Sequence, residues 1–325
     1  MFTRKPLHLL AALCVAATLP LGALASDFPS KPIRFVVPYP PGGIADTISR
    51  AIMERLSARL GQPVIVENRP GGKQIIGTMA VTGAPADGHT LLLSSVTSLS
   101  LNPITVKNLS YDVERDLTPV SNLFHAPLLL VTTPSVPGDT AQDLAAYARA
   151  NPDKLSYGSI GPGSSTHIAA ELFNLQANVE TAHIPYKGSA PAILDLLSDN
   201  VQFMFDGGTS SLPHVESGKL KVRAVTTAER FPYLPNIPTM AEQGFPDYEV
   251  SAWWGVSAPG GTPLEVRERI ATELREILKD QALLDRFGKN GVALRADNPQ
   301  AFADFVTREN TRWTDFFAKS GLQVD

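Results

Sequence analysis

The stretch "IRFVVPYPPGGIADTISRAIMERLSARL", residues 33–60, decides the fold. Its first part, Ile33 to Val37, is apolar and rich in β-branched residues, which predicts a buried strand. Three prolines and two glycines follow. Ile44 to Leu60 then carries isoleucine or leucine at spacings of four and stops at Gly61, which predicts an amphipathic helix. Because Pro63 to Glu67 predicts another strand, the segment is a β-α-β unit of a parallel sheet.

A second unit of the same kind lies near the middle of the chain. Its strands and helices are predicted at Leu155 to Ser159, Thr166 to Leu175, His183 to Tyr186, Pro191 to Leu197, and Val201 to Phe205, with Asp206 at the end of the last strand. The turn "IGPGSS", Ile160 to Ser165, joins the first strand to the first helix. Two such units predict two α/β domains whose strand ends face one another.

Two long extended segments, Ala126 to Thr133 and Glu249 to Pro259, fit the crossings between these domains. Helices predicted at Leu264 to Lys279 and Pro299 to Lys319 then return to the first domain. The sequence therefore predicts a first domain of residues 26–126 and 253–325 and a second of residues 127–252. The proline-rich segment Thr226 to Glu249 is interpreted as a covering or connecting segment.

Residues 1–25 have the three parts of a secretory signal peptide: Arg4 and Lys5, an apolar run, and an Ala-Leu-Ala site. Export to the periplasm is therefore expected. The chain's one cysteine, Cys14, falls in that leader, so a disulfide framework and a thiolate nucleophile are excluded from the mature protein. The formal net charge of −4 gives no support for binding to nucleic acid or an anionic membrane.

The motifs of several common activities are missing. Ser164 stands where the phosphate-binding pattern GxxxxGK[ST] requires lysine, and neither turn fits GxGxxG or the hydrolase elbow GxSxG. The mature histidines show no zinc-site spacing: His89, His125, His167, His183 and His214. We therefore expect no enzyme activity, no cofactor and no metal site.

The two Gly/Pro turns suit an anion instead. The first amides of a helix have no backbone acceptor, glycine lets a ligand approach the backbone, and proline stiffens the turn. Gly42 to Ala45 on one side and Gly163 to Thr166 on the other therefore form a predicted carboxylate clamp. Hydrogen bonds to a charged group contribute ~1.5–3 kcal/mol each, while association costs ~4–15 kcal/mol. Such a clamp therefore needs domain closure to reach micromolar affinity.

Several side chains near the turns have two interpretations. Asp46 either satisfies the start of its own helix or contacts a ligand that carries a hydrogen-bond donor. The same choice applies to Asp206 at its strand end. His167, in the first turn of the second helix, is either a capping residue or a ligand contact. Trp253 and Trp254 are interpreted as packing residues of a crossing strand.

Ordered motifs run along the whole mature chain; they include "YPPGGIAD", "VENRPG", "PADGHTLL", "YGSIGPGSSTHIAAELF", "PYKGSAPAILDLL", "FMFD" and "LPNIPTMAEQGFPDYEVSAWWGVSAPGGTP". In these motifs the chain resembles the extracytoplasmic solute receptors of tripartite tricarboxylate transporters, often called Bug receptors. The resemblance implies a periplasmic binding protein type II-like fold, with two α/β lobes joined by hinge strands, the Venus flytrap architecture. It also implies a monomeric receptor that captures a small organic carboxylate and delivers it to transporter membrane subunits.

The resemblance also implies which residues bind the ligand. They are Tyr39, Gly42, Gly43, Ile44, Asp46, Thr97, Ser159, Gly163, Ser164, Ser165, Thr166, His167 and Asp206. One segment departs from the family pattern, because Gly72, Lys73, Gln74 and Ile75 replace an Ala-Gly-Gly-Asn-like run. If that loop borders the cleft, the ligand can differ from the family's usual dicarboxylates; if it faces solvent, Lys73 is a charged loop residue.

Three questions stay open at the level of sequence. The carboxylate is a di- or tricarboxylate, an acidic amino acid or an aromatic acid. The receptor delivers it to a transporter or presents it to a membrane sensor kinase. The third alternative is a secreted carboxylate-processing enzyme that uses Asp46, Asp206 or His167 as acid or base.

Overall fold

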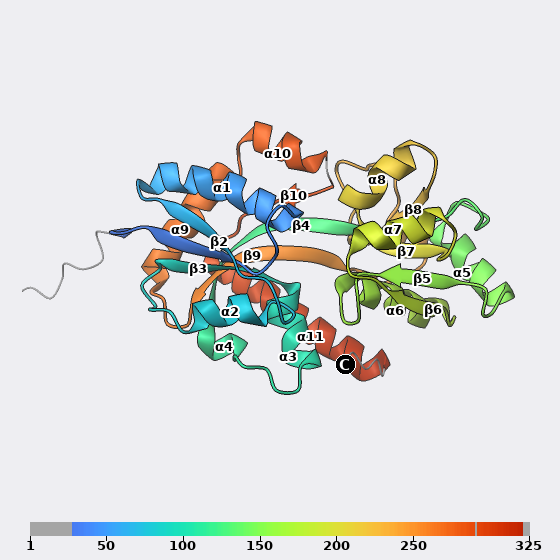
Figure 1. Ribbon diagram of the computed structural model, residues 1–325, viewed down its shortest axis with the longest axis horizontal. Coiled ribbons are helices and arrows are strands. Elements are labelled where there is room, and N and C mark those ends of the chain that lie inside the picture. Colours follow the sequence, from blue (N-terminus) through green and yellow to red (C-terminus); the bar gives the residue numbers. More distant parts are fainter. Residues whose placement is uncertain (1–27, 290, 321–325) are drawn as a thin grey trace, which may run out of the picture.

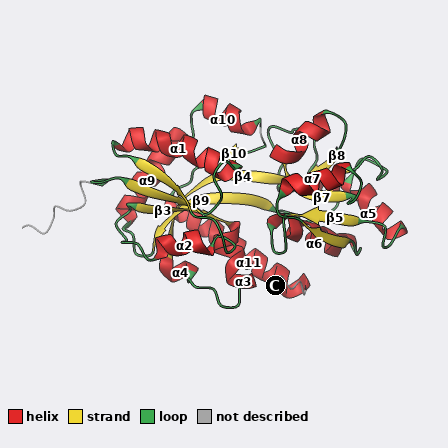
Figure 2. Cartoon of the chain, in the orientation of Figure 1, coloured by secondary structure: helices red, strands yellow, loops and turns green. Residues whose placement is uncertain are grey.

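A computed structural model describes residues 28–289 and 291–320, so the predicted signal peptide lies outside the described residues. Two lobes lie side by side along the longest axis, and strands β4 (Leu117–Thr132) and β9 (Ser251–Pro259) join them (Figure 1). In both lobes helices cover a central sheet (Figure 2). No helix in the described part of the chain has the length and apolar character of a membrane span.

Lobe 1 contains the amino-terminal and carboxyl-terminal elements. They are β1 (Ile33–Val37), α1 (Ile44–Leu60), β2 (Val64–Asn68), α2 (Ile75–Thr82), β3 (Thr90–Ser95), the π-helix η1 (Thr97–Leu101), α3 (Asn102–Thr105), α4 (Val113–Asp116), α9 (Leu264–Ile277), α10 (Gln281–Gly288), β10 (Ala293–Leu294) and α11 (Pro299–Ser320). The first predicted β-α-β unit is confirmed, with α1 bounded as the isoleucine spacing indicates. Its last turn closes at Gly61, which adopts φ 69° and donates to the Ser57 carbonyl at 3.0 Å.

Lobe 2 contains the middle of the chain. Its elements are α5 (Ala141–Ala150), β5 (Ser156–Ser159), α6 (Ser165–Ala177), β6 (Ala182–Pro185), α7 (Ser189–Leu197), β7 (Phe203–Gly207), α8 (Gly208–Glu216), β8 (Lys221–Val225) and the 3₁₀ helix η2 (Ala241–Gln243). The second predicted unit is confirmed, but β7 begins and ends two residues later than expected. Asp206 therefore lies inside the strand and pairs with Leu129 of β4.

The strand directions fix where the turns lie. In lobe 1, β1 runs parallel to β2 and β3, and β3 pairs antiparallel with β9 so that Ser95 lies opposite Trp254. In lobe 2, β7 pairs antiparallel with β4 so that Gly207 lies opposite Leu128, and β5 and β6 run parallel to β7. The carboxyl ends of β1, β2 and β3 therefore point toward lobe 2, and those of β5, β6 and β7 point toward lobe 1.

The core of lobe 1 forms because β1 is buried on both faces. Ile33, Phe35 and Val37 pack in one cluster with Ile48 and Leu56 of α1. Val36 belongs to a second cluster with Val81 of α2. This double burial explains why β1 reads as a continuous apolar run instead of an alternating one.

Of the two crossing strands, β4 is longer and more irregular than the sequence indicates, and β9 begins two residues later than expected. β4 pairs with β9 over most of its length, and its register shifts between Pro119 and Ser121 and again between Asn122 and Phe124. Trp253 of β9 is fully buried and donates to Glu309 of α11 at 2.8 Å. Both predicted domain boundaries fall inside these two strands, and the division at those residues stays a prediction.

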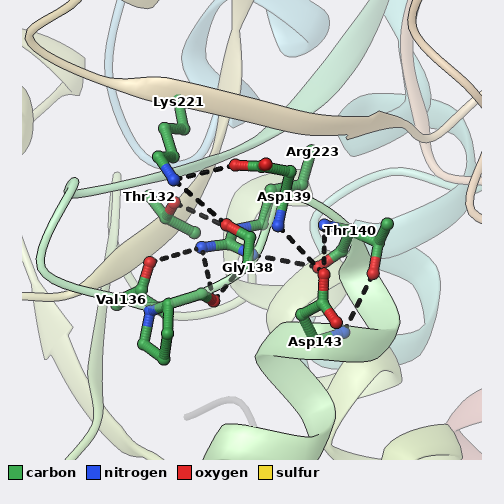
Figure 3. A network of polar contacts seen from close by, with 9 residues as sticks. Thr132, Val136, Gly138, Asp139, Thr140, Asp143, Lys221 and Arg223 are labelled. Carbon is green, nitrogen blue, oxygen red and sulfur yellow. Dashed lines mark hydrogen bonds and ion pairs between the residues drawn. The ribbon is translucent and has the colours of Figure 1, made fainter.

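The outer end of lobe 2 is held by a buried arginine (Figure 3). Arg223 of β8 is 1% exposed and donates to Thr132 Oγ1 at 2.9 Å, to the Val136 carbonyl at 2.9 Å and to the Thr140 carbonyl at 3.1 Å. Burial lowers the pKa of Arg223, and the nearby carboxylates of Asp143 and Asp139 oppose that shift. These bonds satisfy backbone carbonyl groups of the loop between β4 and α5. That loop lies at the end of lobe 2 that is remote from lobe 1.

Candidate ligand site at the lobe junction

The first turn joins β1 to α1 at the inner end of lobe 1. Gly42 adopts φ +85°, a left-handed conformation that glycine tolerates, and Gly43 is the N-cap residue of α1. The Gly42 amide donates to Asp46 Oδ2 at 2.9 Å. Arg50 Nε and Asn68 Nδ2 also donate to the Asp46 carboxylate, at 3.1 and 2.9 Å.

Asp46 is thus fully engaged within the protein. It is 4% exposed. Burial acts to raise the pKa of Asp46, but the hydrogen bonds from Arg50, Gly42 and Asn68 outweigh it and hold the pKa below its usual value. Of the two interpretations that the sequence leaves open, this geometry favours the structural one.

Tyr39 connects the first turn to two other elements. Its hydroxyl accepts hydrogen bonds from Gln74 Nε2 and Trp254 Nε1, each at 2.8 Å. Ser95 Oγ donates to Gln74 Oε1 at 2.8 Å, which extends the chain of bonds to the end of β3. Burial raises the pKa of Tyr39 and outweighs these hydrogen bonds. Trp254 therefore bonds to the first turn as well as packing, because Phe124 stacks on it at 4.6 Å.

The second turn joins β5 to α6 at the inner end of lobe 2. Gly163 adopts φ +73°, and its amide donates to His167 Nδ1 at 3.1 Å. The Ser164 hydroxyl caps the helix by accepting the His167 amide at 3.3 Å. The Thr166 hydroxyl accepts the Ile160 amide and the Ser159 hydroxyl accepts the Gly161 amide, each at 3.0 Å.

The two turns share one local construction. In each, a left-handed glycine donates its amide to the side chain four residues later, which is Asp46 in lobe 1 and His167 in lobe 2. The amides of Gly42 and Gly163 therefore donate within the protein here, and the Ser164 amide does so too, to the Gly161 carbonyl at 3.2 Å. The first amides of α1 and α6 are left without an acceptor inside their helices.

Two predicted residues at the second turn, Ser159 and His167, belong to a polar cluster that also contains His183. Ser159 Oγ lies 2.6 Å from His183 Nε2, and the rings of His167 and His183 stack at 4.1 Å. Tyr157 stacks on His183 at 4.9 Å and bonds to Glu171. Burial lowers the pKa of both histidines to about 4, and for His183 the neighbouring His167 adds to the effect. Both rings are therefore neutral at pH 7.

Asp206 is buried without a hydrogen bond of normal geometry. It is 0% exposed, and neither carboxylate oxygen has a partner in the structure. Burial raises the pKa of Asp206 to about 6, although the hydroxyls of Ser189 and Ser211 and two backbone amides lie near enough to oppose the shift. The Ser211 hydroxyl is also buried and unpartnered. This end of β7 therefore holds three polar atoms that a bound molecule or water would satisfy.

The remaining predicted residue, Thr97, follows β3 at the start of η1. Its amide donates to Ser95 Oγ at 3.2 Å, so it adjoins the chain of bonds that ends at Tyr39. A hollow of about 830 Å³ lies elsewhere, between α5 and α6. It is lined by residues such as Arg149, Glu171 and Asn178. That hollow includes none of the predicted site residues.

Three residues near the site were not predicted to take part in it. Gln74, Asn68 and His183 each bond to a predicted residue, namely to Tyr39, Asp46 and Ser159. Gln74 carried one sequence signal, because it belongs to the run that departs from the family pattern. Asn68 and His183 stand at the ends of predicted strands, but nothing local in the sequence distinguishes them.

These lobes, the two crossing strands and the paired turns at their junction define a periplasmic binding protein of the type II-like, two-lobe class. The chain belongs to the tripartite tricarboxylate transporter family receptors, whose family pattern matches residues 48–322. The resemblance and the fold predicted from the sequence are therefore confirmed.

Individual relatives extend over nearly the whole chain. The "UPF0065 protein in tcbD-tcbE intergenic region" of Pseudomonas sp. (strain P51) is 40% identical, covering 92% of this chain and 89% of the relative. Protein BugT of Bordetella pertussis is 35% identical and covers 92% of each chain. The solved structure of R. palustris Rpa4515 with adipate is 35% identical, has a TM-score of 0.80 and covers 91% of this chain and 99% of that one. MatC from Rhodopseudomonas palustris with bound malate is 29% identical, with a TM-score of 0.75, and covers 89% of this chain and 99% of that one.

Proposed function

We propose that this protein is a monomeric periplasmic receptor that captures a small organic carboxylate between its lobes and delivers it to the membrane subunits of a tripartite tricarboxylate-type transporter. One observation carries the proposal. Two glycine-opened turns, one from each lobe, begin helices α1 and α6 at the junction between the lobes. Free amides at a helix start favour an anion, and adipate and malate are the ligands named for two related structures.

The proposed donors are those that the protein leaves free. In lobe 1 they are the amides of Gly43, Ile44 and Ala45 at the start of α1. In lobe 2 they are the amides of Ser165 and Thr166 with the Ser165 hydroxyl, which makes no hydrogen bond in the described part of the chain. Hydrogen bonds to a charged group contribute ~1.5–3 kcal/mol each, so these donors suffice only when closure of the lobes buries the ligand.

Among the other predicted site residues, most stabilise the protein and one is a candidate ligand contact. Asp46, Ser159, Ser164 and Thr166 hold the turns in shape through side-chain bonds. Tyr39 and His167 link the turns to the strands and helices behind them. Asp206 remains a candidate ligand contact, because its unpartnered oxygens suit a hydrogen-bond donor on the solute.

We do not propose a reaction. The three groups considered as an acid or base are Asp46, held in four hydrogen bonds or ion-pair contacts, His167, bonded to a backbone amide, and Asp206, enclosed at 0% exposure. Asp46 and His167 therefore stabilise their own turns, and Asp206 is a candidate contact for the solute.

Thermal-shift screening tests the proposal. Purified mature protein is heated with mono-, di- and tricarboxylates, acidic amino acids, aromatic acids and neutral sugars. A ligand at about 1,000 times its Kd stabilises the folded state by about 4 kcal/mol, so the Tm rises by several degrees with a cognate carboxylate. A response to neutral sugars together with no response to any carboxylate contradicts the proposal. Solute uptake into vesicles that contain the membrane subunits, with and without the receptor, tests delivery separately.

A further inference from the structure

We propose that Lys73 binds the second acid group of the solute, so that the protein selects dicarboxylates over monocarboxylates. This inference rests on the proposed function, because it assumes that the first acid group binds at the helix starts. It concerns the segment in which this chain departs from its family, Gly71 to Gln74. We call this segment the lysine loop.

The lysine loop lies beside the first turn. It follows β2, whose carboxyl end points toward lobe 2 as that of β1 does. Gln74 Nε2 bonds to the Tyr39 hydroxyl at 2.8 Å, and Tyr39 itself belongs to the first turn. Gly77 of α2 packs so closely on Pro38 that an added Cβ would lie 2.7 Å from the Pro38 Cβ. The loop therefore lies next to the first turn, which favours the alternative in which it borders the ligand.

The backbone of the lysine loop is held in an unfavourable conformation. Four consecutive residues have positive φ: Gly71 at 121°, Gly72 at 55°, Lys73 at 51° and Gln74 at 71°. For a residue with a side chain this conformation costs on the order of 1 kcal/mol. Surrounding bonds compensate, since Asn102 Nδ2 donates to the Lys73 carbonyl at 2.9 Å and Ser95 Oγ donates to Gln74 Oε1. The structure thus fixes the point from which the Lys73 side chain emerges.

The charge of Lys73 is available, whereas Arg50 and Arg69 near the first turn both form ion pairs. Arg50 makes an ion pair with Asp46 at 3.0 Å and bonds to Asn68 Oδ1 at 2.7 Å. Lys73 is exposed and forms no ion pair with any residue that the structure describes. The protein as a whole carries a formal net charge of −4, so a free cation beside the site offsets the repulsion that a dianion meets.

The two kinds of contact do different work. Backbone amides at a helix start bind one carboxylate and do not discriminate between solutes that differ in the rest of their structure. An ammonium group on a flexible stem is a point charge that reaches a second carboxylate over a range of distances. A solute with one acid group gains nothing from it. Lys73 therefore sets specificity and leaves the first recognition step unchanged.

The test compares a diacid with its own half ester, which has the same length and only one charge. Binding of adipate and monomethyl adipate, and of glutarate and its monomethyl ester, is measured by calorimetry. The proteins are the wild type, Lys73→Met, and Lys154→Met as a matched control. Lys154 is another exposed lysine, and it precedes β5 at the end of lobe 2 that is remote from lobe 1.

We expect Lys73→Met to weaken binding of the diacid about tenfold and to leave the half ester within about twofold, because one charge-assisted contact is lost. Lys154→Met should change neither. Methionine keeps the unbranched stem and the same backbone requirement as lysine, so the variant should keep the wild-type Tm.

Three results overturn the inference. Lys73→Met lowers affinity for the diacid and the half ester by the same factor, or changes neither, or the wild type binds monocarboxylates as tightly as diacids of equal length. In each of these cases the proposed receptor function stands, because a carboxylate still binds. If neither a diacid nor a monocarboxylate binds, the proposed function fails and this inference fails with it.

Discussion

At the scale of single residues, Gly42 and Gly163 decide whether the turns exist in this form. Each adopts a left-handed φ and donates its amide to the side chain four residues later. Replacing either glycine strains the turn, because a Cβ disfavours this region of φ by roughly 1–2 kcal/mol. The strained residue lies next to the backbone amides that are proposed to bind the ligand.

We therefore expect Gly42→Ala to lower the free energy of unfolding by about 1 kcal/mol and also to weaken carboxylate binding. An added Cβ at Gly42 meets nothing within 4 Å, so backbone strain is the whole structural cost. Urea denaturation measures the first effect and calorimetry the second.

Gly218→Ala supplies the control. Gly218 has φ +70°, and an added Cβ there also meets nothing within 4 Å, but it follows α8 away from the two turns. It should lose similar stability and keep its ligand affinity. Equal losses of affinity in the two variants would show that the first turn has no special part in binding.

At the scale of elements, the aspartate of β7 and the two histidines of α6 and β6 change the protein's stability with pH in opposite directions. His167 and His183 have pKa values of about 4, below their usual value, so they favour the neutral form and their contribution to stability is lost as the pH falls from about 6.5 to 4. Asp206 has a pKa of about 6, above its usual value, so its contribution is complete below about pH 4 and is lost as the pH rises through 6. The two effects oppose each other in the same range of pH.

The Asp206→Asn variant separates the contribution of Asp206 to stability from that of the two histidines. Relative to the wild type, this variant should gain stability between pH 4 and pH 7, by up to about 3 kcal/mol, because it removes a buried charge without partners. The measurement is the difference between the unfolding free energies of the two proteins in urea at successive pH values. A difference that stays constant from pH 4 to pH 7 would contradict the assigned environment of Asp206.

At the scale of the whole molecule, the lobes meet at a second place besides the crossing strands. Tyr233, in the segment that leads from β8 to β9, donates to the Leu284 carbonyl of α10 at 3.1 Å. Its ring packs against Gly288, where an added Cβ would lie 1.8 Å from Tyr233 Cζ. The segment interpreted from sequence as a cover or connection thus also joins lobe 2 to lobe 1.

A double-mutant cycle measures that contact. Gly288→Ala should destabilise the protein by about 1–3 kcal/mol, since the new methyl group displaces the tyrosine ring. In a Tyr233→Ala background the same change should cost much less, because the space is then empty. The coupling is read from unfolding free energies in urea. Additive losses would mean that the ring does not rest on Gly288 in solution.

The elements that sequence predicted well are those with strong local signals. The isoleucine spacing and Gly61 gave both ends of α1, and the Gly/Pro turns gave the starts of α1 and α6 within one residue. β7 was displaced by two residues because Val201 and Gln202 look like strand residues. The Gln202 amide donates to the Ser156 carbonyl and its carbonyl accepts the Thr133 amide, but the regular pairing of β7 with β4 and β5 begins at Phe203. Apolar composition alone does not fix a strand's register.

The contacts within the site depended on long-range packing. Trp254 and Tyr39 are 215 positions apart and meet only because β9 crosses the end of β3. The bond from Gln74 to Tyr39 likewise requires β1 and β2 to lie side by side. No local pattern of residue types contains such information, so sequence reasoning interpreted Trp254 as packing and left Lys73 with two interpretations.

The sequence by itself determined the α/β units, the two anion-suited turns and the receptor family, because strand and helix periodicity, glycine, proline and ordered motifs are local properties of the chain. Only the tertiary structure decided which donors are free. Asp46 and His167 accept the glycine amides of their own turns. Among residues 28–289 and 291–320, Asp206 has no hydrogen-bond partner and Lys73, next to Gln74 beside the first turn, has no ion pair. Whether a polar group is satisfied depends on neighbours brought from distant parts of the chain, and folding alone brings them together.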